Sequence, residues 1–192
     1  MTPLSSEESY GHFNADTIGD THPQLPLYAY GISKAAVENI GRTYAITDGL
    51  EIINLRSSWI YGPDFPRSRA PINMLRAAAR KQPFAIPFGA DSRVDHTYID
   101  YLVSGVLAAL DHAAHPFDAY HIASSTAPSF GGIATLLNAL IGDDLISVGP
   151  GVYKHADTVE IPRKGALDCS RAFQVFGYKP KYDIRSGLES YL

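Results

Sequence analysis

Short apolar runs alternate with helical segments along all 192 residues, and this alternation constrains the fold more than any other feature of the sequence. Short continuous apolar runs between helices are typical of parallel strands that are buried on both faces. The sequence therefore predicts an α/β fold, with helices on both faces of a parallel sheet. We expect a single α/β domain over residues 1–192, because no repeat, low-complexity tract or linker divides the chain.

The strongest helix prediction runs from Tyr28 to Thr47. Apolar side chains recur there at helical spacing, Pro26 precedes the segment, and Asp48-Gly49 provides a stop signal. A strand is expected at 50–55, followed by a loop through Tyr61-Gly62-Pro63. The other helices are expected at 72–81, 99–112, 130–140, 170–176 and 184–192, and the other strands at 84–87 and 119–122.

The charge balance excludes some classes of partner. Sixteen Lys and Arg against twenty Asp and Glu give a net charge of −4, without any block of like charge. This argues against a nucleic-acid groove or an anionic membrane surface. No apolar run approaches the ~18 residues of a membrane span, and residues 1–11 do not resemble a signal peptide. We therefore expect a soluble, cytoplasmic protein.

Cysteine and histidine usage indicates neither a disulfide nor a metal site. Cys169 is the only cysteine, so an internal disulfide is excluded, and we expect its side chain to pack in or near the core. The seven histidines show no metal-ligand spacing and are expected to be structural or exposed. No metal site is predicted.

Tyr30 and Lys34 stand four residues apart at the start of the predicted helix, which places both side chains on one helical face. A tyrosine has a pKa near 10 and is a poor base at neutral pH unless a nearby cation favours the phenolate. Lys34 can supply that cation. The spacing is common by chance, however, so alone it also fits an ordinary surface helix.

Three further motifs give this pair a context. A Ser-Ser…Tyr-Gly segment at 5–11 precedes the helix, Arg56 leads into Tyr61-Gly62-Pro63 after it, and an Arg-Val-Asp…Tyr-Ile-Asp segment follows at 93–100. With Phe176-Gly177-Tyr178-Lys179-Pro180, this order resembles the extended short-chain dehydrogenase/reductase family, the NAD-dependent epimerase/dehydratase group. The resemblance covers essentially the whole chain. It implies a partial Rossmann-like parallel sheet with flanking helices, plus a small C-terminal substrate-binding subdomain.

The same resemblance implies an NAD- or NADP-dependent sugar epimerase, dehydratase or reductase that acts on a secondary alcohol. Tyr30 would be the catalytic acid/base, and Lys34 would lower its pKa and hold the nicotinamide ribose. Hydride leaves a carbinol carbon only as its hydroxyl proton is removed, so a base near that oxygen is required. Ser6 would bind the reacting oxygen, although it also fits an ordinary serine at the end of a strand.

Other site residues follow from the same comparison. Ser57 would lie beside the cofactor and Ser58 beside the substrate, although both also suit a polar turn before Gly62-Pro63. Arg93 matches a position that holds an anionic part of the substrate. Since Asp91 and Asp95 flank it, Arg93 also fits a surface ion pair.

Glu7 and Trp59 bear on the substrate. Glu7-Glu8 directly follows Ser6 and suits a dehydratase, because elimination needs an additional acid and base, although Glu8 also fits a solvent-facing position. Trp59 stands where many nucleotide-sugar members have an asparagine that donates to the diphosphate. The substitution predicts a simpler sugar, sugar acid or secondary alcohol, held partly by stacking on Trp59, rather than a UDP- or dTDP-sugar.

The cofactor half of such an enzyme is not found in this sequence. None of the sixteen glycines forms a G-x-G-x-x-G or G-x-x-G-x-x-G turn, which would receive a dinucleotide pyrophosphate. We therefore expect NAD or NADP to belong to the full-length enzyme, and the chain alone to bind it weakly and to be inactive. The alternative is a non-catalytic half-domain that binds a partner or a sugar. The resemblance also implies a homodimer, with apolar contacts from Ile40, Tyr44 and the region from Val103 to Leu110.

Overall fold

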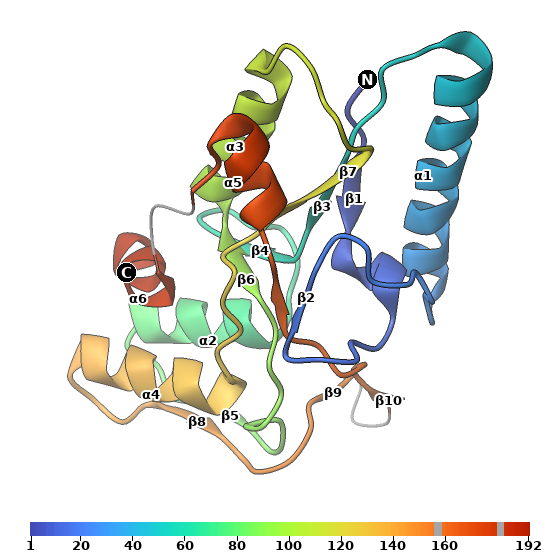
Figure 1. The fold of residues 1–192 in the computed structure, drawn as a ribbon. Coiled ribbons are helices and arrows are strands. Elements are labelled where there is room, and N and C mark those ends of the chain that lie inside the picture. Colours follow the sequence, from blue (N-terminus) through green and yellow to red (C-terminus); the bar gives the residue numbers. More distant parts are fainter. Residues whose placement is uncertain (156–158, 180–182) are drawn as a thin grey trace.

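A three-stranded parallel sheet lies at the centre of the computed structural model, which describes residues 1–155, 159–179 and 183–192. Its order is β1 (Leu4–Ser6), β3 (Asn54–Ser57) and β7 (Ala119–Ile122), with β3 in the middle (Figure 1). The parallel register places Ser6 opposite Ser57, so both strands end at the same edge of the sheet.

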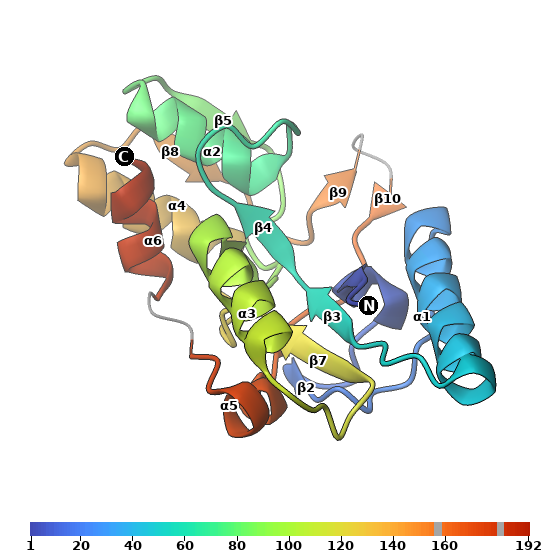
Figure 2. The same ribbon diagram turned by 90° about the horizontal axis from the view of Figure 1, so that it is seen from above.

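Helices cover both faces of this sheet. α1 (Ala29–Asp48) lies on one side, and α3 (Ile99–Asp111) and α5 (Ser170–Phe176) lie on the other (Figure 2). α3 approaches closely because Gly105 has no side chain: a Cβ there would lie 2.5 Å from the Ile122 side chain. The predicted layers of helix, parallel sheet and helix are therefore confirmed.

A second group of helices and strands packs beside the three-stranded sheet and its helices, and this group has its own apolar core. It contains α2 (Ala70–Ala79), α4 (Phe130–Ile141) and α6 (Ile184–Tyr191), together with the parallel pair β5 (Phe84–Ile86) and β8 (Ile146–Val148) (Figure 1). Within the described ranges, no helix is long and apolar enough to cross a membrane.

Short strand pairs join the parts of the molecule. The short elements are η1 (Glu7–Tyr10, a 3-10 helix), β2 (Thr17–Ile18) with β11 (Ala166–Leu167), β4 (Trp59–Tyr61) with β6 (His96–Tyr98), and β9 (Lys154–His155) with β10 (Val159–Glu160). β4 continues the direction of β3 towards α2, as Figure 2 shows, and pairs in parallel with β6.

The predicted elements agree with the structure except in one region. The strand expected at 50–55 begins only at Asn54, and the expected loop contains β4. Trp59–Tyr61 extends because its backbone pairs with His96–Tyr98, a contact between segments too distant in sequence for local patterns to show. Pro180, which closes the last predicted motif, lies outside the described residues.

An ion pair is buried between α1 and β3. The Arg56 guanidinium, 2% exposed, donates to both carboxylate oxygens of Glu38, at 2.6 Å for the closest contact. Ser5 also donates to Glu38, and Arg56 donates to the Tyr10 hydroxyl, which contacts His121 at 2.6 Å. Burial would raise the pKa of Glu38, but the Arg56 hydrogen bonds and charge outweigh burial and hold it below its usual value.

Candidate functional site

A cleft of about 540 Å³ opens where β1 and β3 end, beside the first turn of α1. The carboxyl edge of a parallel sheet is the usual place for ligands in this architecture, and the volume is ordinary for a small-molecule site. Six residues predicted from the sequence line this single cleft: Ser6, Glu7, Tyr30, Ser57, Ser58 and Trp59.

Tyr30 and Lys34 lie as the helical spacing predicts. The Tyr30 side chain is half exposed at the cleft, and the Lys34 Nζ lies 5.5 Å from the centroid of its ring. Lys34 also donates to the Leu4 carbonyl of β1 at 2.8 Å, which fixes its ammonium at the sheet edge. The phenol of Tyr30 therefore lines the cleft, and the ammonium of Lys34 lies beside its ring.

The serines have structural bonds as well as access to the cleft. The Ser6 Oγ accepts a hydrogen bond from the Glu8 amide at 3.2 Å and caps η1. The Ser57 hydroxyl donates to the Ser5 carbonyl at 3.4 Å. Ser58 is buried in the cleft wall. Since a hydroxyl has further donor and acceptor capacity, these bonds are compatible with contact to a ligand.

Glu7 forms a buried ion pair with a residue from the other end of the chain. Its Oε2 lies 2.6 Å from the Lys164 Nζ, and both side chains are 2% exposed. Burial raises the pKa of Glu7 to about 7, although the Lys164 charge opposes this rise. A carboxyl group in the wall of the cleft is thus able to gain or lose a proton near neutral pH.

Trp59 faces the protein interior more than the cleft. It is 7% exposed and packs against His96 and Phe130, with the Arg69 guanidinium 4.7 Å from its ring centroid. The indole therefore fills core volume, and little of its face is left for a sugar. The expectation that its bulk displaces a diphosphate finds no support in this packing.

Arg93 lies away from the other predicted site residues. It lines a second cleft, of about 290 Å³, together with Arg163 and Lys164. Neither flanking acid pairs with it among the described residues: Asp95 is buried and accepts from Ser124, and Asp91 accepts from the Gly151 amide. The Arg93 guanidinium instead donates to the Ala127 carbonyl at 3.3 Å. The structure therefore does not bring Arg93 into the cleft of the other predicted site residues, and its contact with an anionic part of the substrate stays a prediction.

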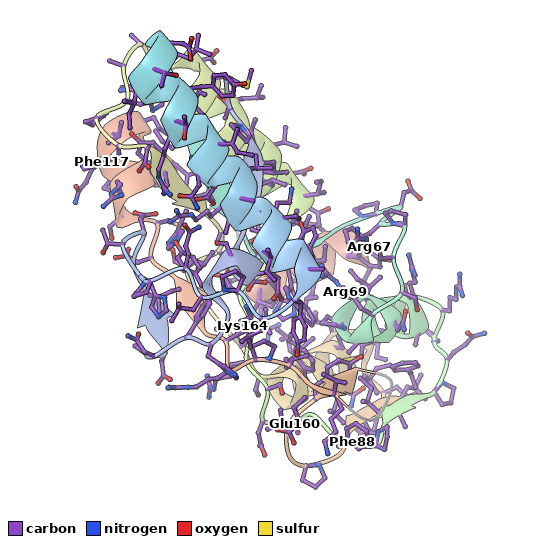
Figure 3. The ribbon with its side chains drawn as sticks, turned by 90° about the vertical axis from the view of Figure 1, so that its right-hand side faces the viewer. Arg67, Arg69, Phe88, Phe117, Glu160 and Lys164 are labelled. Carbon is purple, nitrogen blue, oxygen red and sulfur yellow. The ribbon has the colours of Figure 1, made fainter. Side chains whose placement is uncertain are left out.

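The structure also adds residues that the sequence did not single out. Arg67 and Arg69, which follow the Tyr61-Gly62-Pro63 turn, line the cleft, and Figure 3 shows them with Lys164 around the first turn of α1. The two arginines form a local basic motif that could have been noticed. Lys164 gives no local signal, since its partner Glu7 lies 157 residues away.

The buried position of Cys169 agrees with the prediction. Cys169 is buried, and burial raises the pKa of its thiol to about 12, which suits a packing residue rather than a nucleophile. Across residues 1–155, 159–179 and 183–192, no cluster of three or more His, Cys, Asp or Glu is arranged to hold a metal ion.

Comparison with known proteins identifies relatives. Residues 2–123 match the model of the NAD dependent epimerase/dehydratase family. UDP-glucuronate 4-epimerase 6 of Arabidopsis thaliana is 26% identical over 98% of this chain and 44% of its own length, and dTDP-glucose 4,6-dehydratase of Streptomyces antibioticus is 27% identical over 96% and 54%. The chain thus spans about half the length of these relatives.

The same fold occurs in solved structures. UDP-glucuronic acid 4-epimerase from Bacillus cereus, in complex with UDP-glucuronic acid and NAD, superimposes with a TM-score of 0.82 at 23% identity, over 99% of this chain and 59% of that one. dTDP-glucose 4,6-dehydratase from Bacillus anthracis, in complex with NAD, gives a TM-score of 0.83 at 21% identity, over 99% and 59%. The partial Rossmann-like sheet expected from the sequence is confirmed.

Proposed function

The chain belongs to the NAD dependent epimerase/dehydratase family, and on this basis we propose that it supplies the acid–base chemistry and the sugar cleft of an NAD-dependent sugar epimerase or dehydratase. One observation carries the proposal: Tyr30 and Ser6 line the same cleft, and the Lys34 Nζ lies 5.5 Å from the centroid of the Tyr30 ring. These positions support a proton acceptor with a cation beside it, and a hydroxyl donor in the same cleft.

In this proposal Tyr30 takes the proton from a sugar hydroxyl as the carbon is oxidised, and returns it on reduction. Lys34 holds the nicotinamide ribose through its ammonium group, and Ser6 orients the sugar oxygen by a hydrogen bond. NAD, when bound, supplies the acceptor and donor of hydride at that carbon.

The residues of the cleft fit the nicotinamide end of this cofactor. Lys34 uses one of its three N–H donors on Leu4, which leaves two for a ribose, and Tyr30 is half exposed beside it. Ser57 completes the proposed contacts. No glycine-rich turn for a pyrophosphate occurs in the sequence, so we propose that the 192-residue chain alone binds NAD weakly.

Glu7 favours dehydration over epimerisation. Loss of water from the oxidised sugar removes a proton from the carbon beside the ketone and protonates the departing hydroxyl, so it requires a base and an acid in addition to Tyr30, and Glu8 and Glu7 both line the cleft. Glu7 lines the cleft next to Ser6, and burial raises its pKa above the usual range of a carboxyl group. The proposed substrate is a nucleotide-linked sugar, by analogy with UDP-glucuronate and dTDP-glucose, which the relatives' names specify.

The test is a Tyr30→Phe variant of a protein that joins this chain to a glycine-rich cofactor half. With dTDP-glucose and UDP-glucuronate as substrates, turnover should fall about 10²- to 10⁴-fold while NAD stays bound, because the change removes a proton but little volume. Tyr44→Phe, on an exposed part of the same helix, is the matched control. Mass spectrometry of the products distinguishes loss of water from epimerisation. Near-normal turnover by Tyr30→Phe would contradict the assignment.

A further inference from the structure

Lys164 reaches Glu7 from the segment just before β11, and it lines the second cleft together with Arg93. Its Nζ lies 2.6 Å from the Glu7 Oε2 and 3.5 Å from the Glu8 Oε2, and it contacts the Glu7 carbonyl at 3.4 Å. The ammonium also lies 5.2 Å from the centroid of the Phe13 ring. The lysine is therefore held on several sides, as Figure 3 shows for its place near the first turn of α1.

Three charged groups act on the Glu7 carboxyl. Lys164 is in direct contact and favours the carboxylate, Glu8 on the same turn opposes it, and Arg69 at the start of α2 favours it from the other side of the cleft. Burial opposes the carboxylate more strongly than any of them. Among the charged groups that oppose the effect of burial on the Glu7 pKa, Lys164 has the strongest effect, and it is weaker than that of burial.

A buried ion pair is an inefficient way to stabilise a fold, because desolvation of both charges offsets most of their attraction. Glu7 lines the cleft that also contains Tyr30 and Ser6, whereas Lys164 lines the second cleft, so the ion pair lies between the two clefts. Its position indicates a role in the chemistry of the cleft rather than in stability alone.

We propose that Lys164 is a positioning residue, which holds the Glu7 carboxyl group at the wall of the cleft through a direct buried ion pair. The proposal rests on the proposed function, in which Glu7 is the additional acid of the cleft. It assigns the C-terminal segment before β11 a part in proton transfer, through a contact with the first turn after β1.

The experiment is a ¹³C NMR titration of the glutamate carboxyl groups in the 192-residue chain, which needs neither cofactor nor turnover. Glu7 should titrate near pH 7 in the parent. Lys164→Met should raise this midpoint by about one unit or more, a tenfold gain in proton affinity, because the contacting cation is lost. Lys164→Arg should restore it. Glu8→Gln should move it in the opposite direction, because a like charge is removed.

The opposite signs of these two changes separate an electrostatic role from a structural one. If Lys164→Met does not fold, the parent, Lys164→Arg and Glu8→Gln titrations still decide the question. A parent midpoint near 4.5, a Lys164→Met midpoint that does not rise, or a Glu8→Gln midpoint that does not fall overturns the proposal. Since no turnover is measured, this failure is distinct from the failure of Tyr30→Phe to lose activity.

Discussion

Gly31 and Glu8 are in backbone contact: a Cβ built on Gly31 would lie 2.2 Å from the Glu8 carbonyl oxygen. This contact sets how closely the first turn of α1 approaches the segment that follows β1. Tyr30 stands directly before Gly31, and Glu7 directly before Glu8. The spacing between the two sides of the cleft therefore depends on the absence of one side chain.

Gly31→Ala is expected to push α1 away from η1. The added methyl group meets backbone rather than a flexible side chain, so overpacking should cost about 1–3 kcal/mol of unfolding free energy. Denaturant unfolding of the 192-residue chain measures this cost. Gly19→Ala is the control, because its Cβ would meet nothing within 4 Å. Equal stability of the two variants would show that α1 shifts without cost.

Glu38→Gln is expected to destabilise the chain by about 3–5 kcal/mol, because it leaves the Arg56 guanidinium buried without its counter-charge. Thermal or denaturant unfolding provides the measurement. Glu51→Gln, at an exposed carboxylate, should change stability by less than about 0.5 kcal/mol. A loss in Glu38→Gln as small as that of the control would mean that solvent reaches Arg56.

Asp95 and His96 are adjacent and fully buried, and their effects on stability should depend on pH with opposite signs. Burial lowers the pKa of His96 to about 3, so the stability that neutral His96 provides is present above pH 6.5 and is lost as pH falls towards 3. The stability of His96→Gln relative to the parent should therefore rise by about 1.4 kcal/mol per unit as pH falls through this range.

Burial raises the pKa of Asp95 to about 6, despite hydrogen bonds from Ser124 that oppose the rise. The parent is then most stable, with respect to this group, below pH 3.8, and loses stability as pH rises through about 6. The stability of Asp95→Asn relative to the parent should rise with pH over this interval. Urea unfolding at several pH values tests both variants, and a shared sign would contradict the assigned pKa directions.

The exposed side chains of α1 indicate where the homodimer predicted from the resemblance would form its contact. Ile40 and Tyr44 on α1 are 56% and 52% exposed, an arrangement that often marks an interface. Ile40→Asp should shift light-scattering mass towards the monomer at high protein concentration. Val152→Asp, at an exposed position outside both predicted contact regions, should have less effect. An equal response of both variants would place the contact elsewhere or show general aggregation.

Local patterns predicted the helices well, because the helical period depends on neighbouring residues. In α1 the pattern was right about the helix, yet its apolar members Val37, Ile40 and Tyr44 are exposed. The buried face carries small residues and Glu38, whose partner Arg56 lies on β3. A periodicity argument alone could not show which face packs on the sheet.

In the candidate site, too, some positions follow from sequence order and others depend on contacts between distant segments. Ser6, Tyr30 and Ser57 lie together because parallel strands end at one edge, and this could be predicted from sequence order. The place of Arg93 and the pairing of Lys164 with Glu7 depend on contacts between distant segments. β4 was missed because its three residues are too few to show a period.

The contact between Lys164 and Glu7 also sets when the cleft can form during synthesis. β2 pairs with β11, and the Ala166 amide donates to the Asp16 carbonyl, so segments far apart in the sequence contact each other here. Contacts of such long sequence separation slow folding, because a large loop must close before they form. A nascent chain on the ribosome therefore holds Glu7 without its counter-charge until residue 164 has left the exit tunnel. A stalled or shortened product that lacks this segment would expose an acidic turn to chaperones and proteases.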